Sequence, residues 1–152
     1  SVDVSTFCFN ISDSNNGTYS APNVDKYSIS FPTSAGTVYG GTLTVDQDGS
    51  GVLVVDTEYY KLTGEPIHYG DNVYRYSGWT KYKSVKACSH YQASTNKYIN
   101  NSVTIVTSEN RLYVNDVRYV NDATALSNYI NSNNIYMVCE LNAPVSYNLC
   151  AN

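Results

Sequence analysis

Residues 42–55 read TLTVDQDGSGVLVV. Two short runs of Thr, Leu and Val flank a polar segment, and its Asp-Gly pair suits the positive φ that a tight turn requires. Such runs of apolar and β-branched residues, bounded by turn residues, indicate strands. The segment therefore predicts a β-hairpin with its turn over 46–51.

The same turn partly matches a calcium-binding loop. Asp46 and Asp48 stand at the first and third positions and Gly51 at the sixth. Such a loop ends on a bidentate Glu at the twelfth position, where this chain has Thr57. A plain hairpin turn is therefore favoured, and no metal site is predicted.

Period-two alternation recurs along the chain, while residues 9–23 lack any period and predict a loop. A strand over 27–31 is expected to stop at Pro32, and 135–141 predicts an apolar strand central in a sheet. A three-stranded meander is predicted over 103–106, 112–114 and 117–120. These signals predict an all-β, mainly antiparallel fold of about 7–10 strands. We expect a sandwich or barrel forming one domain over 1–152.

One segment departs from strand periodicity and predicts a short helix near 122–131. Asp122 can cap its first turn, and four apolar residues then fall on one helical face. The run Asn131–Asn134 is expected to end it. The residues of the apolar face are Ala123, Leu126, Tyr129 and Ile130.

The composition favours an extracellular protein. The chain has 16 Tyr against 3 Phe and 1 Trp, and 14% of its residues are charged, against about 25% in average domains. It opens on Ser1 without a signal-peptide pattern, so we expect a mature secreted form. No apolar run approaches the roughly 20 residues of a membrane-spanning helix, so no membrane span is expected.

Four cysteines without a CxxC pair favour two disulfides over a zinc site. The alternative is four buried free thiols in a cytosolic protein, which the low content of Lys and Glu disfavours. Three pairings are possible, of which we favour Cys8–Cys150 and Cys88–Cys139. Three glycosylation sequons begin at Asn10, Asn16 and Asn100. These features fit an oxidising compartment.

Charge is segregated along the chain. Residues 72–108 hold no acid but five cations, whereas residues 1–71 hold nine acids and two lysines. Cations interleaved with aromatic rings can hold an anionic partner, since cations pair with phosphate or sulfate while rings stack. The alternative is that the lysines only solvate the outer face of a strand while the tyrosines pack beneath it. Acidic segments elsewhere could also neutralise the stretch in the folded chain. The predicted ligand-binding residues are Tyr74, Arg75, Tyr76, Trp79, Lys81, Tyr82, Lys83 and Lys86.

A second hypothesis places catalysis in the same region. Glu58, His68, Arg75 and His90 could supply a base, an acid and a cation for RNA cleavage. The inventory of many tyrosines and four cysteines resembles that of small fungal guanyl ribonucleases, which implies a secreted ribonuclease. Their short motifs are not found in this chain, and no nucleophile motif is present either.

Two functions from different classes follow. The favoured one is a secreted, non-enzymatic binding or effector protein that engages a glycan, nucleic acid or host protein through a basic, Tyr-rich surface over residues 72–98. The alternative is a small secreted ribonuclease or other hydrolase, and whether the chain is an enzyme is left open. A structural cell-wall or coat component is a third reading, but it leaves the charge segregation unexplained. No cofactor is predicted.

Overall fold

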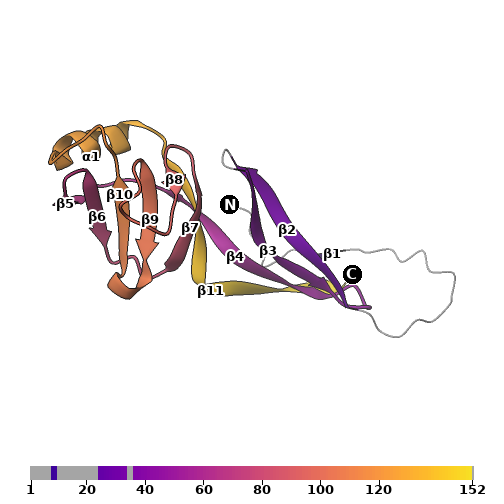
Figure 1. Cartoon of the computed structure of the whole chain (residues 1–152). Helices are drawn as coiled ribbons and strands as arrows, with labels where there is room; N and C mark the ends of the chain where they lie inside the picture. The colour runs from indigo at the N-terminus through magenta and orange to yellow at the C-terminus, as the bar shows by residue number, and fades with distance from the viewer. Residues whose placement is uncertain (1–7, 10–23, 34–35, 152) are drawn as a thin grey trace. The chain divides into compact units, whose positions relative to one another are not determined.

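The computed structural model describes residues 8–9, 24–33 and 36–151 (Figure 1). The chain forms two compact units. One comprises Ser1–Ser30, Tyr39–Asp56 and Pro144–Asn152, and the other comprises Phe31–Val38 and Thr57–Ala143. Several strands continue from one unit into the other, so the prediction of one domain over 1–152 stays a prediction.

The described residues are mostly in strands, with one α-helix and one 3-10 turn. In chain order the elements are β1 (Cys8–Phe9), β2 (Asp25–Thr33), β3 (Gly36–Val45), β4 (Gly51–Lys61), β5 (Ile67–Gly70), β6 (Val73–Ser77), β7 (Tyr82–Cys88), β8 (Gln92–Ala93), β9 (Ser102–Val106), η1 (Thr107–Glu109), β10 (Arg111–Asn115), α1 (Ala123–Ser132) and β11 (Tyr136–Ala151).

These strands make two sheets. One follows the order β1-β11-β4-β3-β2, with β7 also paired to β11, and the other follows β5-β6-β10-β9-β8. The β1–β11 and β8–β9 pairs are parallel, whereas β3–β4, β5–β6, β6–β10, β9–β10 and β7–β11 are antiparallel. The prediction of a mainly antiparallel all-β fold with one short helix is confirmed, and the two sheets are consistent with a sandwich.

The hairpin predicted over 42–55 is confirmed. Strands β3 and β4 pair in antiparallel register from Gly41 opposite Val55 to Val45 opposite Gly51. The turn is closed by a 2.7 Å bond from Asp46 N to Ser50 O, and Gly49 adopts φ 87°. The Asp48 carboxylate accepts a 2.9 Å bond from Ser50 N. The acids of this segment thus serve the turn itself.

Two strand boundaries differ from prediction. Strand β2 runs through Pro32 to Thr33 rather than stopping at the proline. Since β2 is the edge strand of its sheet, the missing N–H of Pro32 is tolerated. Strand β11 begins at Tyr136 and continues to Ala151, well past the predicted end at residue 141. The predicted loop over 9–23 lies almost wholly outside the described residues.

The third strand of the predicted meander is wrong, because residues 117–120 form a turn. The Asp116 carboxylate accepts a 3.1 Å bond from Arg118 N, and Tyr119 N donates to Asp116 O at 3.1 Å. Such local bonds to an Asp side chain compete with strand pairing. The third strand beside β9 and β10 is instead β6.

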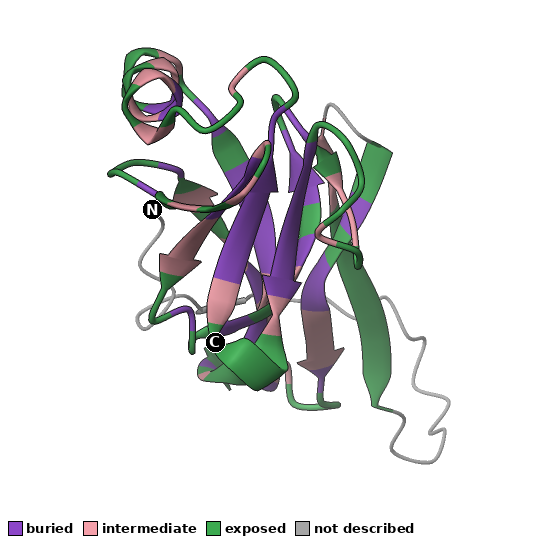
Figure 2. Cartoon of the chain, turned by 60° about the vertical axis from the view of Figure 1, so that its left-hand side comes forward, coloured by how far each residue is buried: buried purple, intermediate pink, exposed green. Residues whose placement is uncertain are grey.

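Helix α1 is confirmed in place and in capping. The Asp122 side chain accepts a 3.0 Å bond from Ala125 N, and the helix ends at Ser132 with Asn133 as its C-cap. Leu126 and Ile130 are fully buried in the core cluster, together with Val103, Leu112, Val114 and other residues of β9 and β10 (Figure 2). The helix therefore packs its apolar face on the five-stranded sheet.

The predicted Cys88–Cys139 disulfide is wrong, because both residues are buried free thiols. In the β7–β11 register Cys88 stands opposite Met137, and Cys139 stands opposite Val85. The two cysteines are thus diagonal neighbours, typically about 7–8 Å apart, beyond the usual span of a disulfide.

Cys150 is disulfide-bonded. The register of β1 on β11 places it opposite Cys8. The side chain of Cys8 is not among those described, so the Cys8–Cys150 pair stays a prediction. Within the described residues, no helix is both long and apolar enough to span a membrane.

Candidate functional site

The four residues of the catalytic hypothesis are engaged by separate neighbours. Glu58 receives bonds from Lys81 and Tyr82, and His90 bonds Ser89 Oγ through Nδ1 at 2.6 Å. His68 Nε2 lies 3.0 Å from Asp71 O, and its ring meets that of Tyr74 edge to face. His68 and Arg75 lie on neighbouring strands, but His68 is opposite Tyr74, so alternation directs Arg75 to the other face. Within the described residues no contact joins any two of the four.

The lysines of the basic stretch are paired with carboxylates. Lys81 lies 2.8 Å from Glu58, and Lys83 and Lys86 each lie 3.1 Å from Glu140. Burial works against ionisation of Glu140, but hydrogen bonds from Ser84, Lys86 and Lys83 outweigh it and lower the pKa of Glu140. The charge of Lys81 is therefore balanced by Glu58, whereas Lys83 and Lys86 share the single negative charge of Glu140.

Most rings of the predicted contact surface face the interior, which corrects the expectation of an open face. Tyr74 is fully buried, Tyr82 is 5% exposed and Trp79 is 9% exposed. They belong to the core cluster, where the ring of Tyr60 meets those of Trp79 and Tyr82 edge to face. Tyr76 is half-buried against the same core, and burial raises its pKa. These rings fill the core because the chain has only three Phe to do so.

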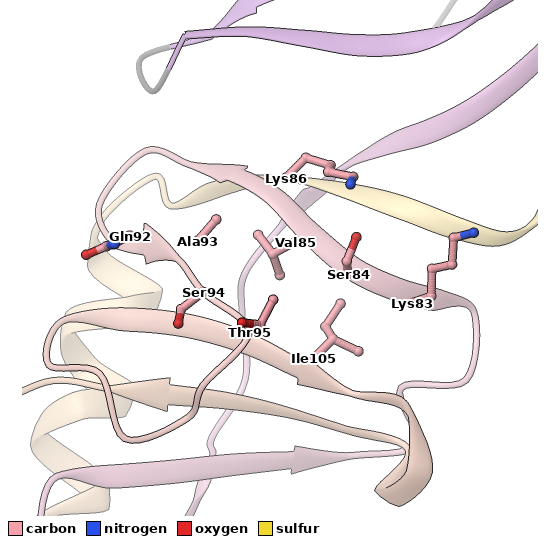
Figure 3. A pocket seen from close by; sticks show the side chains of 9 residues that line it. All are labelled: Lys83, Ser84, Val85, Lys86, Gln92, Ala93, Ser94, Thr95 and Ile105. Carbon is pink, nitrogen blue, oxygen red and sulfur yellow. The ribbon is translucent and has the colours of Figure 1, made fainter.

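A groove of about 500 Å³ lies beside β7 (Figure 3). Figure 3 shows Lys83, Ser84 and Lys86 directed toward β11, with Val85 on the other side of the strand. The two lysines and Ser84 are all bound to Glu140, so their polar groups are already satisfied. The lining residues are Lys83, Ser84, Val85, Lys86, Gln92, Ala93, Ser94, Thr95 and Ile105.

A different group of rings and cations lies on the outer face of the five-stranded sheet. On β9 and β10 alternate residues such as Val103, Leu112 and Val114 enter the core, so Thr104 and Tyr113 take the opposite face. The register aligns Thr104, Tyr113, Arg75 and Ile67 across four strands. We call Tyr69, Arg75, Lys97, Tyr98 and Tyr113 the tyrosine–cation face.

Lys97 is the centre of this face. Its Nζ lies 4.5 Å from the ring centroid of Tyr113, 4.7 Å from that of Tyr69 and 5.6 Å from that of Tyr98. It also donates to Tyr69 Oη at 3.3 Å and lies 3.5 Å from Glu109. The rings of Tyr69 and Tyr113 meet edge to face at 5.2 Å. The loop that carries Lys97 is fixed by a 3.2 Å bond from Asn115 Nδ2 to Lys97 O.

The three tyrosines of this face differ in how far their rings are exposed to solvent. Tyr113 is 1% exposed and lies beneath Lys97, whereas Tyr69 is 40% and Tyr98 is 63% exposed. Exposed aromatic rings held by fixed neighbours lose little conformational freedom on binding, which favours affinity. Tyr69 and Tyr98 are therefore the rings of this face that a ligand can reach.

The phenols and the ammonium polarise one another. Hydrogen bonds from Tyr98 and Lys97 lower the pKa of Tyr69, and the bond to Tyr69 raises the pKa of Tyr98. Burial by itself would lower the pKa of Lys97, but its bond to Tyr69 and the neighbouring Tyr113 and Glu109 outweigh burial and raise it. Lys97 is thus charged throughout the physiological range.

Arg75 is the least satisfied member of the face. It is half-buried, and its Cζ lies 6.0 Å from the ring centroid of Tyr69. Its Nε is buried without a hydrogen-bond partner, and Arg75 makes no ion pair with any described residue. A cation in this condition is a ready binding group for an anion.

Of the predicted contact residues, only Arg75 belongs to the tyrosine–cation face. Lys97 and Tyr98 lie within the predicted surface over 72–98 but were not named as contact residues, and Tyr69 on β5 and Tyr113 on β10 lie outside it. The lack of acidic residues over 72–108 pointed to the region of Lys97 and Tyr98, but no local motif pointed to these two residues. The sequon at Asn100 lies in an exposed turn close to this loop, while those at Asn10 and Asn16 lie outside the described residues.

Comparison of the chain with models of protein families, with curated proteins and with solved structures finds no match. The function is therefore argued from the site alone.

Proposed function

We propose that the protein is an extracellular, non-enzymatic binding protein that recognises a glycan through its tyrosine–cation face. The observation that carries the proposal is the exposed pair of Tyr69 on β5 and Tyr98 on the loop between β8 and β9, both beside Lys97. A phenol ring offers an apolar face and a hydroxyl at once. That combination matches a sugar, which has both C–H faces and hydroxyl groups.

Charge favours a glycan over a nucleic acid. Nucleic-acid affinity comes chiefly from neutralising many phosphates, and the chain has a net charge of −4. Lys81, Lys83, Lys86 and Lys97 all have carboxylate partners. Few cations are thus left for a polyanionic backbone, whereas a short oligosaccharide needs only a few contacts.

The extracellular assignment is likewise a proposal. It is supported by the low content of charged residues and by the disulfide at Cys150, because disulfides persist in oxidising compartments. The buried thiols of Cys88 and Cys139 are compatible with it, since burial makes thiols inert.

The hydrolase alternative has less support. A base and an acid must both reach the same substrate atoms within hydrogen-bond distance. His68 and Arg75 lie on opposite faces of the sheet, and Glu58 is bound to Lys81 and Tyr82. No observation on the described residues favours cleavage over binding.

A glycan array probed with the wild-type protein and two variants tests the proposal. Tyr98→Ala removes the most exposed ring of the face, and Tyr136→Ala removes a ring that is 45% exposed outside it. We expect the first to weaken binding about tenfold, equal to about 1.4 kcal/mol, and the second to leave binding unchanged. Absence of any retained glycan, or equal binding by all three proteins, would reject the proposal.

A further inference from the structure

We propose that Arg75 is an oxyanion-binding subsite, so that the recognised glycan carries a carboxylate or a sulfate. The inference rests on the proposed function and adds the chemical class of the ligand. It is argued from the charge balance of the region, from unsatisfied polar atoms and from the geometry of the guanidinium.

The charge balance singles out Arg75. Residues 72–108 contain five cations, and the four lysines among them are paired with Glu58, Glu109 or Glu140. Arg75 has no such partner within the described residues, although it is half-buried. Removing a charge from water without a counter-charge is unfavourable. An anionic ligand would supply the missing partner.

Among the described residues, two of the three unsatisfied polar atoms lie on the sheet face that carries the tyrosine–cation face. Three buried side-chain atoms of the described residues lack a hydrogen-bond partner: Arg75 Nε, Thr104 Oγ1 and Tyr76 Oη. The first two lie in one register row, separated by Tyr113. Since such atoms are few in a folded protein, two in one row indicate a place that a ligand completes.

The surrounding charges leave room for an anion. Both Arg75 Cζ and Lys97 Nζ lie within 6.0 Å of the Tyr69 ring centroid. Glu109, the one acid that contacts Lys97, also pairs with Arg111 at 3.9 Å and accepts a bond from Tyr113. It makes no contact with Arg75. The face therefore holds more positive than negative charge next to its exposed rings.

The shape and charge of the Arg75 guanidinium indicate which ligand groups it would bind. Arginine presents a planar fork of N–H donors that matches the paired oxygens of a carboxylate or sulfate, which an ammonium cannot do. A neutral sugar can offer hydroxyl oxygens to the same fork but no negative charge to balance it. An acidic sugar with its ring on Tyr69 or Tyr98 and its oxyanion on Arg75 would use both parts of the face.

Calorimetric titration with three tetrasaccharides tests this inference. The probes are a chondroitin sulfate tetrasaccharide, its unsulfated form, which keeps the carboxylates, and neutral chitotetraose. The proteins are wild type, Arg75→Gln, Arg75→Lys and the control Lys86→Met, which removes a cation bound to Glu140 on another face. Fluorescence of Trp79, the single tryptophan, checks that each variant is folded.

We expect both Arg75 variants to lose tenfold or more in affinity for the acidic probes, with chitotetraose and Lys86→Met unaffected. Because Arg75→Lys keeps the positive charge, a loss of affinity in this variant shows that the paired N–H donors of the guanidinium are needed. A loss confined to the sulfated probe identifies sulfate, and a loss on both acidic probes identifies the carboxylate. If wild type binds all three probes equally and the Arg75 variants behave as wild type, the inference is overturned while the proposed function stands. If wild type binds none of them, both are overturned.

Discussion

Asp116→Asn should destabilise the unit that carries the site more than any other conservative polar change in it. The Asp116 side chain is fully buried and accepts bonds from Tyr91 Oη at 2.8 Å, Arg118 Nε at 2.9 Å and Arg118 Nη2 at 2.7 Å. An amide retains one acceptor oxygen but presents an NH₂ group to donors that the second oxygen had served. The substitution also removes the negative charge that holds Arg118, whose Cζ lies 4.1 Å from the ring centroid of Tyr129 in α1.

The magnitude follows from these contacts. Leaving one partner of a buried ion pair unpaired costs about 3–5 kcal/mol, but the Arg118 side chain is 51% exposed, so water takes up part of its charge. Loss of one charged hydrogen bond costs about 1.5–3 kcal/mol. We therefore expect a loss of about 2–4 kcal/mol in the free energy of unfolding.

Urea unfolding followed by Trp79 fluorescence measures this loss, because Trp79 lies in the core cluster of the same unit. With a slope of about 2 kcal/mol/M, within the usual range of about 1–3, the midpoint should fall by about 1–2 M. Asp71→Asn makes the same chemical change at an exposed residue and should shift stability by less than about 0.5 kcal/mol. A loss below about 1 kcal/mol for Asp116→Asn would refute the reasoning.

Three further outcomes follow from buried groups. Burial opposes ionisation of Asp116, but hydrogen bonds from Arg118 and Tyr91 outweigh it and hold the pKa of Asp116 below the ordinary value. The ionised carboxylate therefore contributes its full stabilisation above about pH 4, and this is lost as pH falls through the folded pKa. Acid unfolding of Asp116→Asn should lack this loss of stability. Burial raises the pKa of Cys88 and raises that of Cys139 to about 12, so neither thiol should react with a maleimide at pH 7 until denaturant is added; rapid labelling of the native protein would contradict this. Ile130→Ala, at a fully buried residue of α1, should cost about 2–5 kcal/mol in urea unfolding, and a cost below about 1 kcal/mol would show that the helix is not anchored to the core.

The features predicted correctly from sequence are those fixed by local chemistry. The turn over 46–51 needs only its own residues, since Asp46, Asp48 and Gly49 close it. The cap of α1 likewise joins Asp122 to Ala125, three residues away. Neighbouring residues determine both structures, so a single sequence suffices to predict them.

The features that were missed depend on contacts between distant residues. Residues 117–120 alternate like a strand, but Asp116 draws Arg118 and Tyr119 into a turn. The lysines of the basic stretch meet Glu58 and Glu140, which lie outside the acid-free segment. Strand register and a loop bring Tyr69, Lys97 and Tyr113 together in the tyrosine–cation face. No short sequence motif predicts this contact.

The most direct test of the tyrosine–cation face as a binding site is two-dimensional NMR of the labelled protein titrated with an acidic tetrasaccharide. The account predicts that the largest shifts fall on the backbone amides of Tyr69, Lys97 and Tyr98 and on the Arg75 Nε–H. Shifts centred on Lys83 and Lys86 of β7, or on His90 and α1, with the face unchanged, would contradict it.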